Sequence, residues 1–392
     1  MTRLDWTKLP VLEDLPDLKG ARVLVRADLN VPLVKNPSAK AGESLWSVGD
    51  DFRIRSCVPT LFWLANNGAK ITVCSHLGRP HGEPDPKWEM APVAKRLAEI
   101  GPPVTVLENL RFNAGEEAND ADFVKALIEN QDYFVNDAFG VSHRSHASVV
   151  GPPQHLPSAA GRLLEREVQV LTSLLESPSK PFVAVVGGAK VSEKLGVLTS
   201  LSKVADKILV GGAMAFTFLR AMGLSIGDSL VEPDRVDECR KLLESCATVI
   251  VPTDTVCLSP GGKFGADGQG GETKIIEGDI PEHWRGLDIG PVTTKKYAQE
   301  VEMAQTVFWN GPMGVCEDSR FKEGTRGVAQ AVAKCPGFTV VGGGDSAKAI
   351  GDLGLTGAAD YVSTGGGASL ELIECGDLPG LKALRDSVKS SD

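Results

Sequence analysis

The stretch PFVAVVGGAKVSEK, residues 181–194, indicates the fold class of this chain. Residues 182–186 are apolar and rich in valine, as in a buried strand of a parallel sheet. Two glycines follow, and then Lys190 and Lys194, which we expect on one face of a helix because they lie four residues apart. A strand, a glycine turn and a helix in this order place backbone N–H groups where a phosphate can bind. An ordinary turn with solvated lysines is the plainer interpretation of this stretch taken alone.

The same pattern recurs on both sides of that stretch, because short apolar runs alternate with helix-length amphipathic segments. Among the later runs, most end in glycine: KILVGGAMA (207–215), TVIVPTD (248–254), TVFWNGP (306–312), FTVVGGGDS (338–346) and YVSTGGGAS (361–369). The earlier runs end in polar or charged residues: ARVLVRADLN (21–30), AKITVCSHLG (69–78), VTVLENLRF (104–112) and YFVNDAFG (133–140). We predict an α/β chain of two doubly wound, parallel-sheet, Rossmann-like domains joined by a hinge helix.

The domain boundaries follow from residues 161–181, GRLLEREVQVLTSLLESPSKP, whose apolar residues lie near helical spacing. We expect an N-terminal domain at 1–165, a connecting hinge helix at 166–180 and a C-terminal domain at 181–374. An ordinary surface helix of the first domain is nearly as compatible with the connecting segment. The polar insert at 34–51 and the tract at 258–274 are expected to be surface loops.

The composition excludes several classes of protein. The chain has 392 residues, a net charge of −10, 42% hydrophobic residues and 23% charged ones, which excludes disorder and a basic surface for nucleic acid. The eight cysteines form no C-x-x-C pair and no zinc-finger spacing. No apolar run suits a signal peptide or a membrane span, so we expect a cytoplasmic location and no membrane partner.

The strand ends of the first half carry the candidate residues of an anion site. Ligands of open α/β sheets bind beyond the carboxyl ends of the strands. The polar residues there are Asp28, Asn30, His76, Arg79, Arg111, His143 and Arg144, and Arg53 stands near the start of a helix. Each arginine alone fits a surface salt bridge, but four of them at separate strand or helix ends predict a site for a small, multiply anionic molecule.

The glycine triplets of the second half are candidate phosphate-binding turns. GGGDS at 342–346 and STGGGAS at 363–369 cost more backbone entropy than a turn needs. Asp345 follows the first triplet and suits a Mg²⁺ ion on a nucleotide, although an Asp that caps a helix is equally compatible with this position. A Walker A motif, a G-x-S-x-G elbow, an H-E-x-x-H motif and a G-x-G-x-x-G fingerprint do not occur. The pattern favours phosphoryl transfer between two domains.

Nine ordered motifs resemble the phosphoglycerate kinase family over essentially the whole chain. They are VLVRADLNVPL, SHLGRP, ENLRF, DAFGVSHRSHAS, GGAKVSEK, GGAMAFTFL, WNGPMGV, GGGDS and STGGGASLELIE. The resemblance implies a monomeric, hinge-bending glycolytic enzyme that interconverts 1,3-bisphosphoglycerate plus MgADP with 3-phosphoglycerate plus MgATP. It also implies a tail, at about 375–392, that packs on the N-terminal domain.

The resemblance assigns roles to the candidate residues. Those that hold phosphoglycerate are implied to be Asp28, Asn30, Arg53, His76, Arg79, Arg111 and Arg144. Those that hold the nucleotide are implied to be Gly188, Ala189, Lys190, Lys194, Gly211, Gly212, Asn310, Pro312, Glu317, Gly342, Gly343, Gly344, Asp345 and Ser346. Among them Glu317 takes a ribose hydroxyl and Asp345 the magnesium ion. The residues implied to act on the transferring group are Arg53, Lys190, Gly343 and Gly366.

Two other hypotheses stand beside this one. The first is a catalytically impaired nucleotide-binding or moonlighting protein on the same scaffold, which the presence of Lys190 and Asp345 disfavours. The second is a dinucleotide-dependent oxidoreductase that uses the glycine turns, which the missing fingerprint disfavours.

Three features depart from the family pattern. The segment LAEIGPPVTVLENLRF runs from a helix almost directly into ENLRF, where the family usually has a further strand and helix. The first domain is therefore expected to be trimmed. The insert at 34–51 is longer than the usual loop, and Ala213 stands where a third glycine is common.

Overall fold

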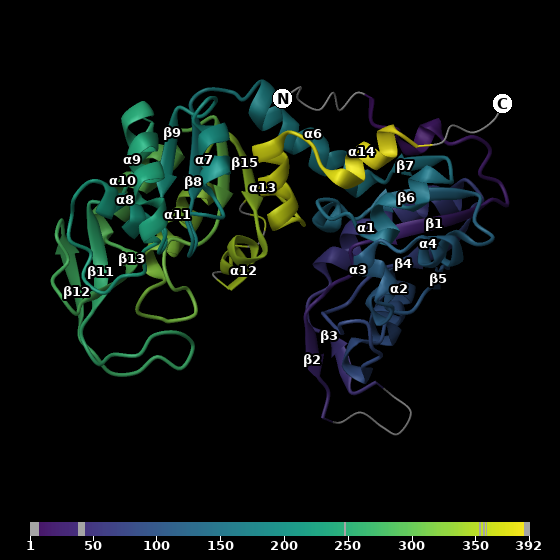
Figure 1. Cartoon of the computed structure of the whole chain (residues 1–392), viewed down its shortest axis with the longest axis horizontal. Helices are drawn as coiled ribbons and strands as arrows, with labels where there is room; N and C mark the ends of the chain where they lie inside the picture. Colours follow the sequence, from purple (N-terminus) through teal and green to yellow (C-terminus); the bar gives the residue numbers. More distant parts are fainter. Residues whose placement is uncertain are drawn as a thin grey trace. The chain divides into compact units, whose positions relative to one another are not determined.

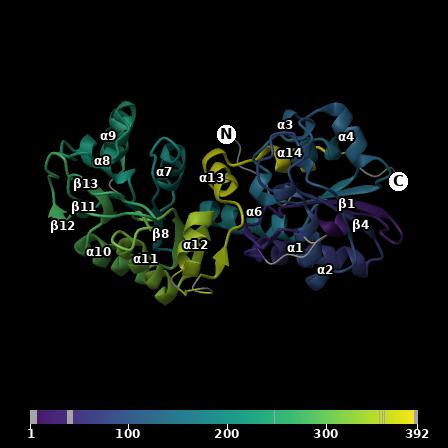
Figure 2. The same ribbon diagram turned by 90° about the horizontal axis from the view of Figure 1, so that it is seen from below.

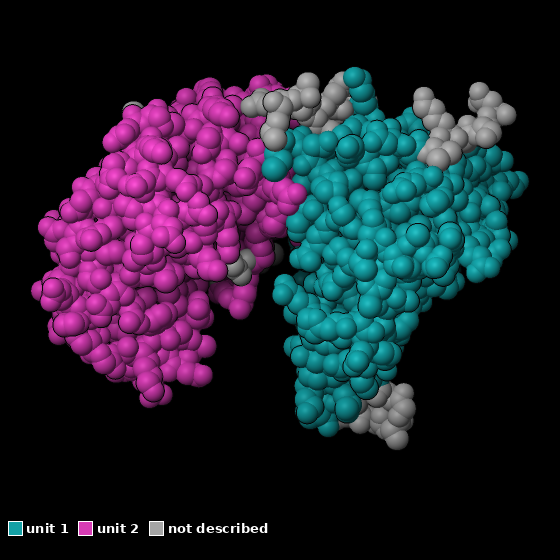
Figure 3. Space-filling model, in the orientation of Figure 1, with its two compact units in different colours: residues 1–170, 375–392 teal, residues 171–374 magenta. Residues whose placement is uncertain are grey.

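The computed structural model divides the chain into two compact units (Figure 1). Unit 1 comprises residues 1–170 and 375–392, and unit 2 comprises residues 171–374, as coloured in Figure 3. The structure describes residues 8–37, 44–246, 248–352, 354–355, 357 and 359–387, without the side chain of Asp345. Each unit is a layered α/β structure with its own parallel sheet.

Unit 1 is built on a five-stranded parallel sheet. Its strands are β1 (Arg22–Ala27), β4 (Lys70–Cys74), β5 (Thr105–Val106), β6 (Tyr133–Asp137) and β7 (Ser158–Ala160). They lie in the order β5-β4-β1-β6-β7, and every pairing is parallel. The chain starts in the middle, builds outward on one side and then returns to build on the other. This is the doubly wound topology.

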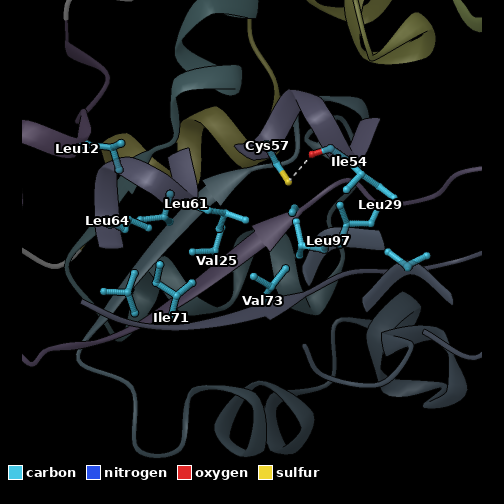
Figure 4. Close-up of a cluster of buried hydrophobic side chains, with 14 of the residues drawn as sticks. Leu12, Val25, Leu29, Ile54, Cys57, Leu61, Leu64, Ile71, Val73 and Leu97 are labelled. Atoms are coloured by element: carbon cyan, nitrogen blue, oxygen red, sulfur yellow. Dashed lines mark hydrogen bonds between the residues drawn. The ribbon is translucent and has the colours of Figure 1, made fainter. Parts of the chain in front are cut away.

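Helices cover both faces of this sheet, as Figure 2 shows for α1 and α2 on one side and α3, α4 and α14 on the other. Their bounds are Phe52–Asn66 for α1, Ala91–Ile100 for α2, Gly115–Ala118 for α3, Ala121–Ile128 for α4, Ala147–Val150 for α5 and Pro379–Arg385 for α14. The buried apolar residues of α1 recur at 54, 57, 61 and 64, which is the spacing of one helical face. Figure 4 shows these side chains meeting those of β1 and β4 in one apolar cluster.

Unit 2 contains a six-stranded parallel sheet. Its strands are β8 (Phe182–Val186), β9 (Lys207–Val210), β10 (Val249–Ile250), β14 (Thr306–Asn310), β15 (Phe338–Gly342) and β16 (Tyr361–Val362), in the order β10-β9-β8-β14-β15-β16. The helices are α7 (Leu195–Leu201), α8 (Ala215–Ala221), α9 (Val236–Ser245), α10 (Pro291–Glu302), α11 (Glu323–Lys334), α12 (Gly344–Asp352) and α13 (Gly366–Cys375). Counted in chain order this sheet runs 3-2-1-4-5-6, the Rossmann arrangement. The predicted fold class is confirmed.

An additional antiparallel sheet in unit 2 was not expected from the sequence. It consists of β11 (Asp254–Leu258), β12 (Thr273–Glu277) and β13 (Arg285–Ile289), with β11 in the middle. The tract predicted to be a surface loop connects β11 to β12, so its ends belong to strands. The prediction missed this sheet because β12 is mostly exposed and lacks an alternating apolar pattern.

Two local predictions in unit 1 were wrong. The insert at 34–51 is not only a loop, because β2 (Leu33–Lys35) and β3 (Trp46–Val48) pair as an antiparallel hairpin, while residues 38–43 lie outside the described parts. The segment VTVLENLRF is a strand only at β5, and Leu110–Phe112 form a 3-10 helix instead. Asn109 accepts a hydrogen bond from the N–H of Arg111, which favours that turn over an extended strand.

Helix α6 (Arg162–Glu176) crosses from the residues of unit 1 into those of unit 2. Its first turn is held by two side chains of unit 1. Oδ1 of Asp137, at the end of β6, accepts the N–H of Leu163 at 2.9 Å, and Oγ1 of Thr60 accepts the N–H of Arg162 at 2.8 Å. These bonds satisfy donors that a helix start leaves open.

In the tail, the N–H of Gly380 donates to the carbonyl of Ser142. No helix within the described residues is long and apolar enough to cross a membrane.

The carboxyl group of Asp137 makes stability depend on pH. Burial raises its pKa from the ordinary 3.8 to about 7, so the folded protein binds a proton that the unfolded chain releases. The protonated carboxyl contributes its full share of the unfolding free energy below pH 3.8, the ordinary pKa that applies in the unfolded chain. This contribution is lost as the pH rises through about 7. We expect Asp137→Asn, which keeps an oxygen acceptor for the helix, to weaken the decline in unfolding free energy between about pH 4 and about pH 7.

Urea denaturation at several pH values measures the slope of the unfolding free energy against pH. Some slope should remain in the variant, because burial also raises the pKa of Asp288 to about 7. Asp132→Asn is the control, since hydrogen bonds from Arg22 lower the pKa of Asp132 to about 2. The stability that Asp132 contributes is lost only as the pH falls toward that value, below the window. An equal slope in the wild type and Asp137→Asn would contradict the assignment.

Candidate functional site

Some candidate residues of each unit lie where the order of its parallel sheet reverses, and others follow the neighbouring strands. In unit 1 this switch point is between β1 and β6, and in unit 2 it is between β8 and β14. Loops that leave the two strands run in opposite directions there and leave a crevice at the carboxyl ends, where ligands of such sheets bind. Asp28 follows β1, Gly187 and Gly188 follow β8, and Pro312 follows β14 closely.

In unit 1 a chain of hydrogen bonds connects five residues from four separate segments of the chain. Nη1 of Arg53 donates to Oδ2 of the buried Asp28 at 2.7 Å, and Oδ1 of Asp28 accepts the N–H of Asn30 at 3.3 Å. Oδ1 of Asn30 accepts the N–H of Gly78 at 2.8 Å, and the carbonyl of Gly78 accepts from Nη1 of Arg111 at 2.8 Å. The structure therefore joins four predicted substrate residues through the backbone of Gly78.

His76 is a neutral side chain at the centre of this cluster. It is buried, and burial together with nearby guanidinium groups, that of Arg26 above all, holds its pKa well below the ordinary value. Nη2 of Arg26 lies 3.2 Å from Nδ1 of His76. Because a guanidinium can only donate, Nδ1 is the acceptor and the proton of the imidazole is on Nε2. His76 is thus fixed as a hydrogen-bond donor through Nε2.

Positive charge accumulates around this histidine. The guanidinium groups of Arg26, Arg111, Arg53 and Arg144 all lie close enough to lower the pKa of His76. Arg79 is exposed, and no ion pair or hydrogen bond joins its side chain to a described residue of the cluster. The arrangement suits a small molecule with several negative charges, because it offers guanidinium donors and one fixed N–H in a largely buried setting.

Sequence reasoning missed Arg26 and Glu116, two buried residues that support this cluster. Arg26 is buried within β1, where Nε donates to Oγ of Ser148 at 2.8 Å. Glu116 has 0% exposure, and its carboxylate accepts from both Oγ and N–H of Ser148 and lies 4.0 Å from Nη2 of Arg26. The available signal was a charged residue inside an otherwise apolar strand, since Arg26 interrupts the run VLVRA.

In unit 2 a cavity of about 440 Å³ lies beside the predicted nucleotide residues. Of these, the cavity is lined by Gly188, Ala189, Gly212, Pro312 and Glu317. Its volume suits a nucleoside, because small-molecule sites measure about 300–1,000 Å³. The sequence had not indicated Phe264, Leu230 and Leu287, which supply apolar wall.

Gly212 shows why glycines meet at this cavity. Its φ is 66°, and an added Cβ would lie 2.5 Å from the carbonyl oxygen of Gly188. Two backbone segments thus approach more closely than any side chain allows, and Gly211 shares the same turn. Ala213 lines the cavity directly after this pair.

The two predicted lysines do not lie on one helix face, which corrects that expectation. Helix α7 begins at Leu195, so both lysines precede it, in a non-helical segment in which Gly188 has a φ of 126°. Lys190 is 61% exposed and lies 3.9 Å from Glu193, whereas Nζ of Lys194 donates to Oδ1 of Asn310. The lysines therefore have different surroundings.

The glycine turns after β15 and before α13 meet one another. A Cβ on Gly366 would lie 2.6 Å from Cα of Gly343, whose φ is 96°. Oγ of Ser346 accepts the N–H of Gly311 at 2.7 Å, and Nδ2 of Asn310 donates to the carbonyl of Gly342 at 2.9 Å. Gly344 and Asp345 begin α12, but the side chain of Asp345 lies outside the described part of the chain. These glycines thus bring the start of α13 to the end of β15.

Comparison with known proteins gives the family. The sequence model of phosphoglycerate kinase matches residues 12–106 and 101–376. The chain belongs to the phosphoglycerate kinase family. Phosphoglycerate kinases of Rubrobacter xylanophilus and of a Roseiflexus species are 48% and 45% identical to it. The matches cover 94% and 95% of this chain, and 96% and 98% of those relatives.

Solved structures agree with this assignment. Phosphoglycerate kinase from Coxiella burnetii has a TM-score of 0.82 and 36% identity to the chain, and that from Pyrococcus horikoshii has a TM-score of 0.78 and 30% identity. Each match covers 96% of this chain and 98% of the solved one. The resemblance drawn from nine motifs is confirmed. The two segments matched by the family model meet at 101–106, where the sequence suggested a trimmed first domain.

Proposed function

We propose that the chain catalyses the reversible transfer of a phosphoryl group between 1,3-bisphosphoglycerate and MgADP, which gives 3-phosphoglycerate and MgATP in glycolysis. The observation that carries this proposal is the group of guanidinium side chains around the neutral His76, at the carboxyl ends of β1 and β4. This group suits the phosphate and carboxylate of phosphoglycerate. The family of the chain and the nucleoside-sized cavity in unit 2 support it. Membership of the phosphoglycerate kinase family leaves no ground for the oxidoreductase hypothesis.

The chemistry needs no general base on the protein. The acceptor of the phosphoryl group is a carboxylate, which is ionised at neutral pH. Catalysis then consists of alignment and of neutralising charge on the moving group. We assign this task to Arg53, Lys190 and the backbone N–H groups near Gly343 and Gly366. Glu317, which lines the cavity, is assigned to a ribose hydroxyl.

A magnesium ion fits the start of α12. Asp345 stands in the first turn of that helix, beside the junction of Gly343 and Gly366. Among the described residues, no three His, Cys, Asp or Glu side chains form a metal-binding group. One carboxylate with water and phosphate oxygens is the donor set that Mg²⁺ prefers when it binds with a nucleotide. When bound, the ion neutralises charge on the phosphate oxygens.

Closure of the two units belongs to the same proposal. The proposed phosphoglycerate residues are in unit 1 and the proposed nucleotide residues in unit 2, so the transfer requires a closed state in which the two units bring their ligands together. We assign the hinge to residues 166–180, the phosphoglycerate-binding domain to 1–165 with the tail, and the nucleotide-binding domain to 181–374. The proposed enzyme is a cytoplasmic monomer without a nucleic-acid partner.

A coupled assay tests the function. Purified protein is given 3-phosphoglycerate and MgATP, and the 1,3-bisphosphoglycerate formed is reduced enzymatically, with and without EDTA. We expect turnover that EDTA abolishes and excess Mg²⁺ restores. Calorimetric binding of both ligands without turnover would contradict the proposed activity, and turnover that resists EDTA would contradict the metal.

A further inference from the structure

The indole ring of Trp88 lies directly against Gly78. Gly78 has a φ of 63°, and a Cβ built on it would overlap the six-membered part of the ring. The ring therefore occupies the space beside the loop that any side chain at position 78 would need. Trp88 is half-buried and also packs against the apolar core of unit 1. An aromatic surface anchored in the core thus supports the backbone of Gly78.

Asn109 connects the same two segments through the backbone. Its Nδ2 donates to the carbonyl of Trp88 at 2.8 Å and to that of Leu77 at 2.7 Å, and its Oδ1 accepts the N–H of Leu77 at 3.2 Å. The loop 77–80 and the segment of Trp88 are thus joined by packing and by hydrogen bonds. A shift of Trp88 would be transmitted to Gly78.

Gly78 is the residue through which the two sides of the phosphoglycerate site are joined. Its N–H holds Oδ1 of Asn30 and its carbonyl holds Nη1 of Arg111, each at 2.8 Å. A displacement of this peptide would move both side chains, because each bond is near its optimal length. The positions of Asn30 and Arg111 therefore depend on what supports Gly78.

The hairpin of the insert supports Trp88 through a lysine. Nζ of Lys87 lies 4.4 Å from the ring centroid of Trp88 and 5.2 Å from that of Trp46, which is on β3. Both distances are within the range of cation–π interactions. Oδ1 of Asp85 fixes the backbone of Lys87 by accepting its N–H at 2.8 Å. The insert is thus connected by side chains to the site.

We propose that the stack of Trp46, Lys87 and Trp88 positions Gly78, and through it Asn30 and Arg111, for binding phosphoglycerate. Trp88 is a positioning residue in this arrangement, because it acts through Gly78. The inference rests on the proposed function, since it concerns the affinity of that site for 3-phosphoglycerate. It gives the insert at 34–51 a role in substrate binding.

Steady-state kinetics of Trp88→Leu test the inference. We expect the KM for 3-phosphoglycerate to rise about tenfold, while the KM for MgATP changes less than about twofold. Trp88→Phe keeps an aromatic face against Gly78 and should restore most of the affinity. An unchanged KM for 3-phosphoglycerate in Trp88→Leu would overturn the proposal.

Tyr133→Leu is the matched control for a loss of aromatic packing. Tyr133 is half-buried against the same core but begins β6, at the amino end of the sheet. Its replacement should lower Tm and leave the KM for 3-phosphoglycerate unchanged. A rise in KM as large as that of Trp88→Leu would show that general loosening of unit 1 is the cause, and would overturn the positioning role.

Lys87→Met tests the part played by the hairpin, because methionine keeps the stem and loses the charge. We expect the KM for 3-phosphoglycerate to rise about threefold, and to rise no further when Trp46→Leu is added. No change in Lys87→Met would overturn the role of the hairpin. The wild type serves as the reference throughout. Absence of turnover in the wild type contradicts the proposed function. If the wild type is active and the variants have the same KM for 3-phosphoglycerate as the wild type, only this inference is contradicted.

Discussion

Arg53→Ala is expected to lower kcat about a thousandfold, because losing a cation aimed at a transferring phosphoryl group costs on the order of 10³ to 10⁵. Arg53 lies in the first turn of α1, and it is one of the four arginines whose guanidinium groups lower the pKa of His76. Its side chain keeps 29% exposure although Nη1 is bonded to the buried Asp28. Asp28 thus fixes the position of Nη1, while the Arg53 side chain as a whole remains partly exposed.

The experiment measures kcat and both KM values for Arg53→Ala and Arg53→Lys. Lysine keeps the charge but not the planar fork, so we expect a loss of about a hundredfold. Arg55→Ala is the matched control, because Arg55 is on the same helix, is 61% exposed and pairs with Asp51. We expect normal turnover in that control and folded circular dichroism spectra in all variants. Near-normal kcat in Arg53→Ala would remove Arg53 from the transition state.

The parallel sheets could be predicted from the sequence because their strands are buried on both faces. Residues 182–186 are all buried, as an uninterrupted apolar run requires. The antiparallel strand β12 could not be predicted in the same way, since Lys274 and Glu277 are exposed on it and only Ile276 is half-buried. Its place depends on pairing with β11, which is a tertiary property that a local pattern does not contain.

The candidate site was predictable where a polar residue ends a buried strand. Asp28 and His76 are such residues, and they follow the neighbouring parallel strands β1 and β4 at the same edge of the sheet. Glu116 was not predictable, because it stands in the polar run GEEAND and its partners Arg26, His146 and Ser148 are all distant in the sequence. The role of Gly78 was hidden for another reason, since it bonds through its backbone.

Glu116→Ala is expected to lower the free energy of unfolding by about 3–5 kcal/mol, the usual cost of removing one partner of a buried ion pair. The carboxylate is fully buried and lies 4.0 Å from Nη2 of Arg26, which is buried as well. Without it the guanidinium stays in the interior with no other ion-pair partner among the described residues, and the N–H of Ser148 loses its acceptor. Arg26 also fixes Nδ1 of His76, so we expect a higher KM for 3-phosphoglycerate at temperatures where the variant is folded.

Urea denaturation followed by circular dichroism measures the stability, and two further variants identify its cause. Glu116→Gln keeps an oxygen acceptor for Ser148 but removes the charge, so its loss should be smaller than that of alanine yet clear. Asp122→Ala removes a carboxylate that is 89% exposed and pairs with Lys125, so no measurable change is expected. If Glu116→Ala were as stable as Asp122→Ala, Arg26 would have to be stabilised by its neutral partners alone. The buried charge pair would then have no part in holding His76 as a donor.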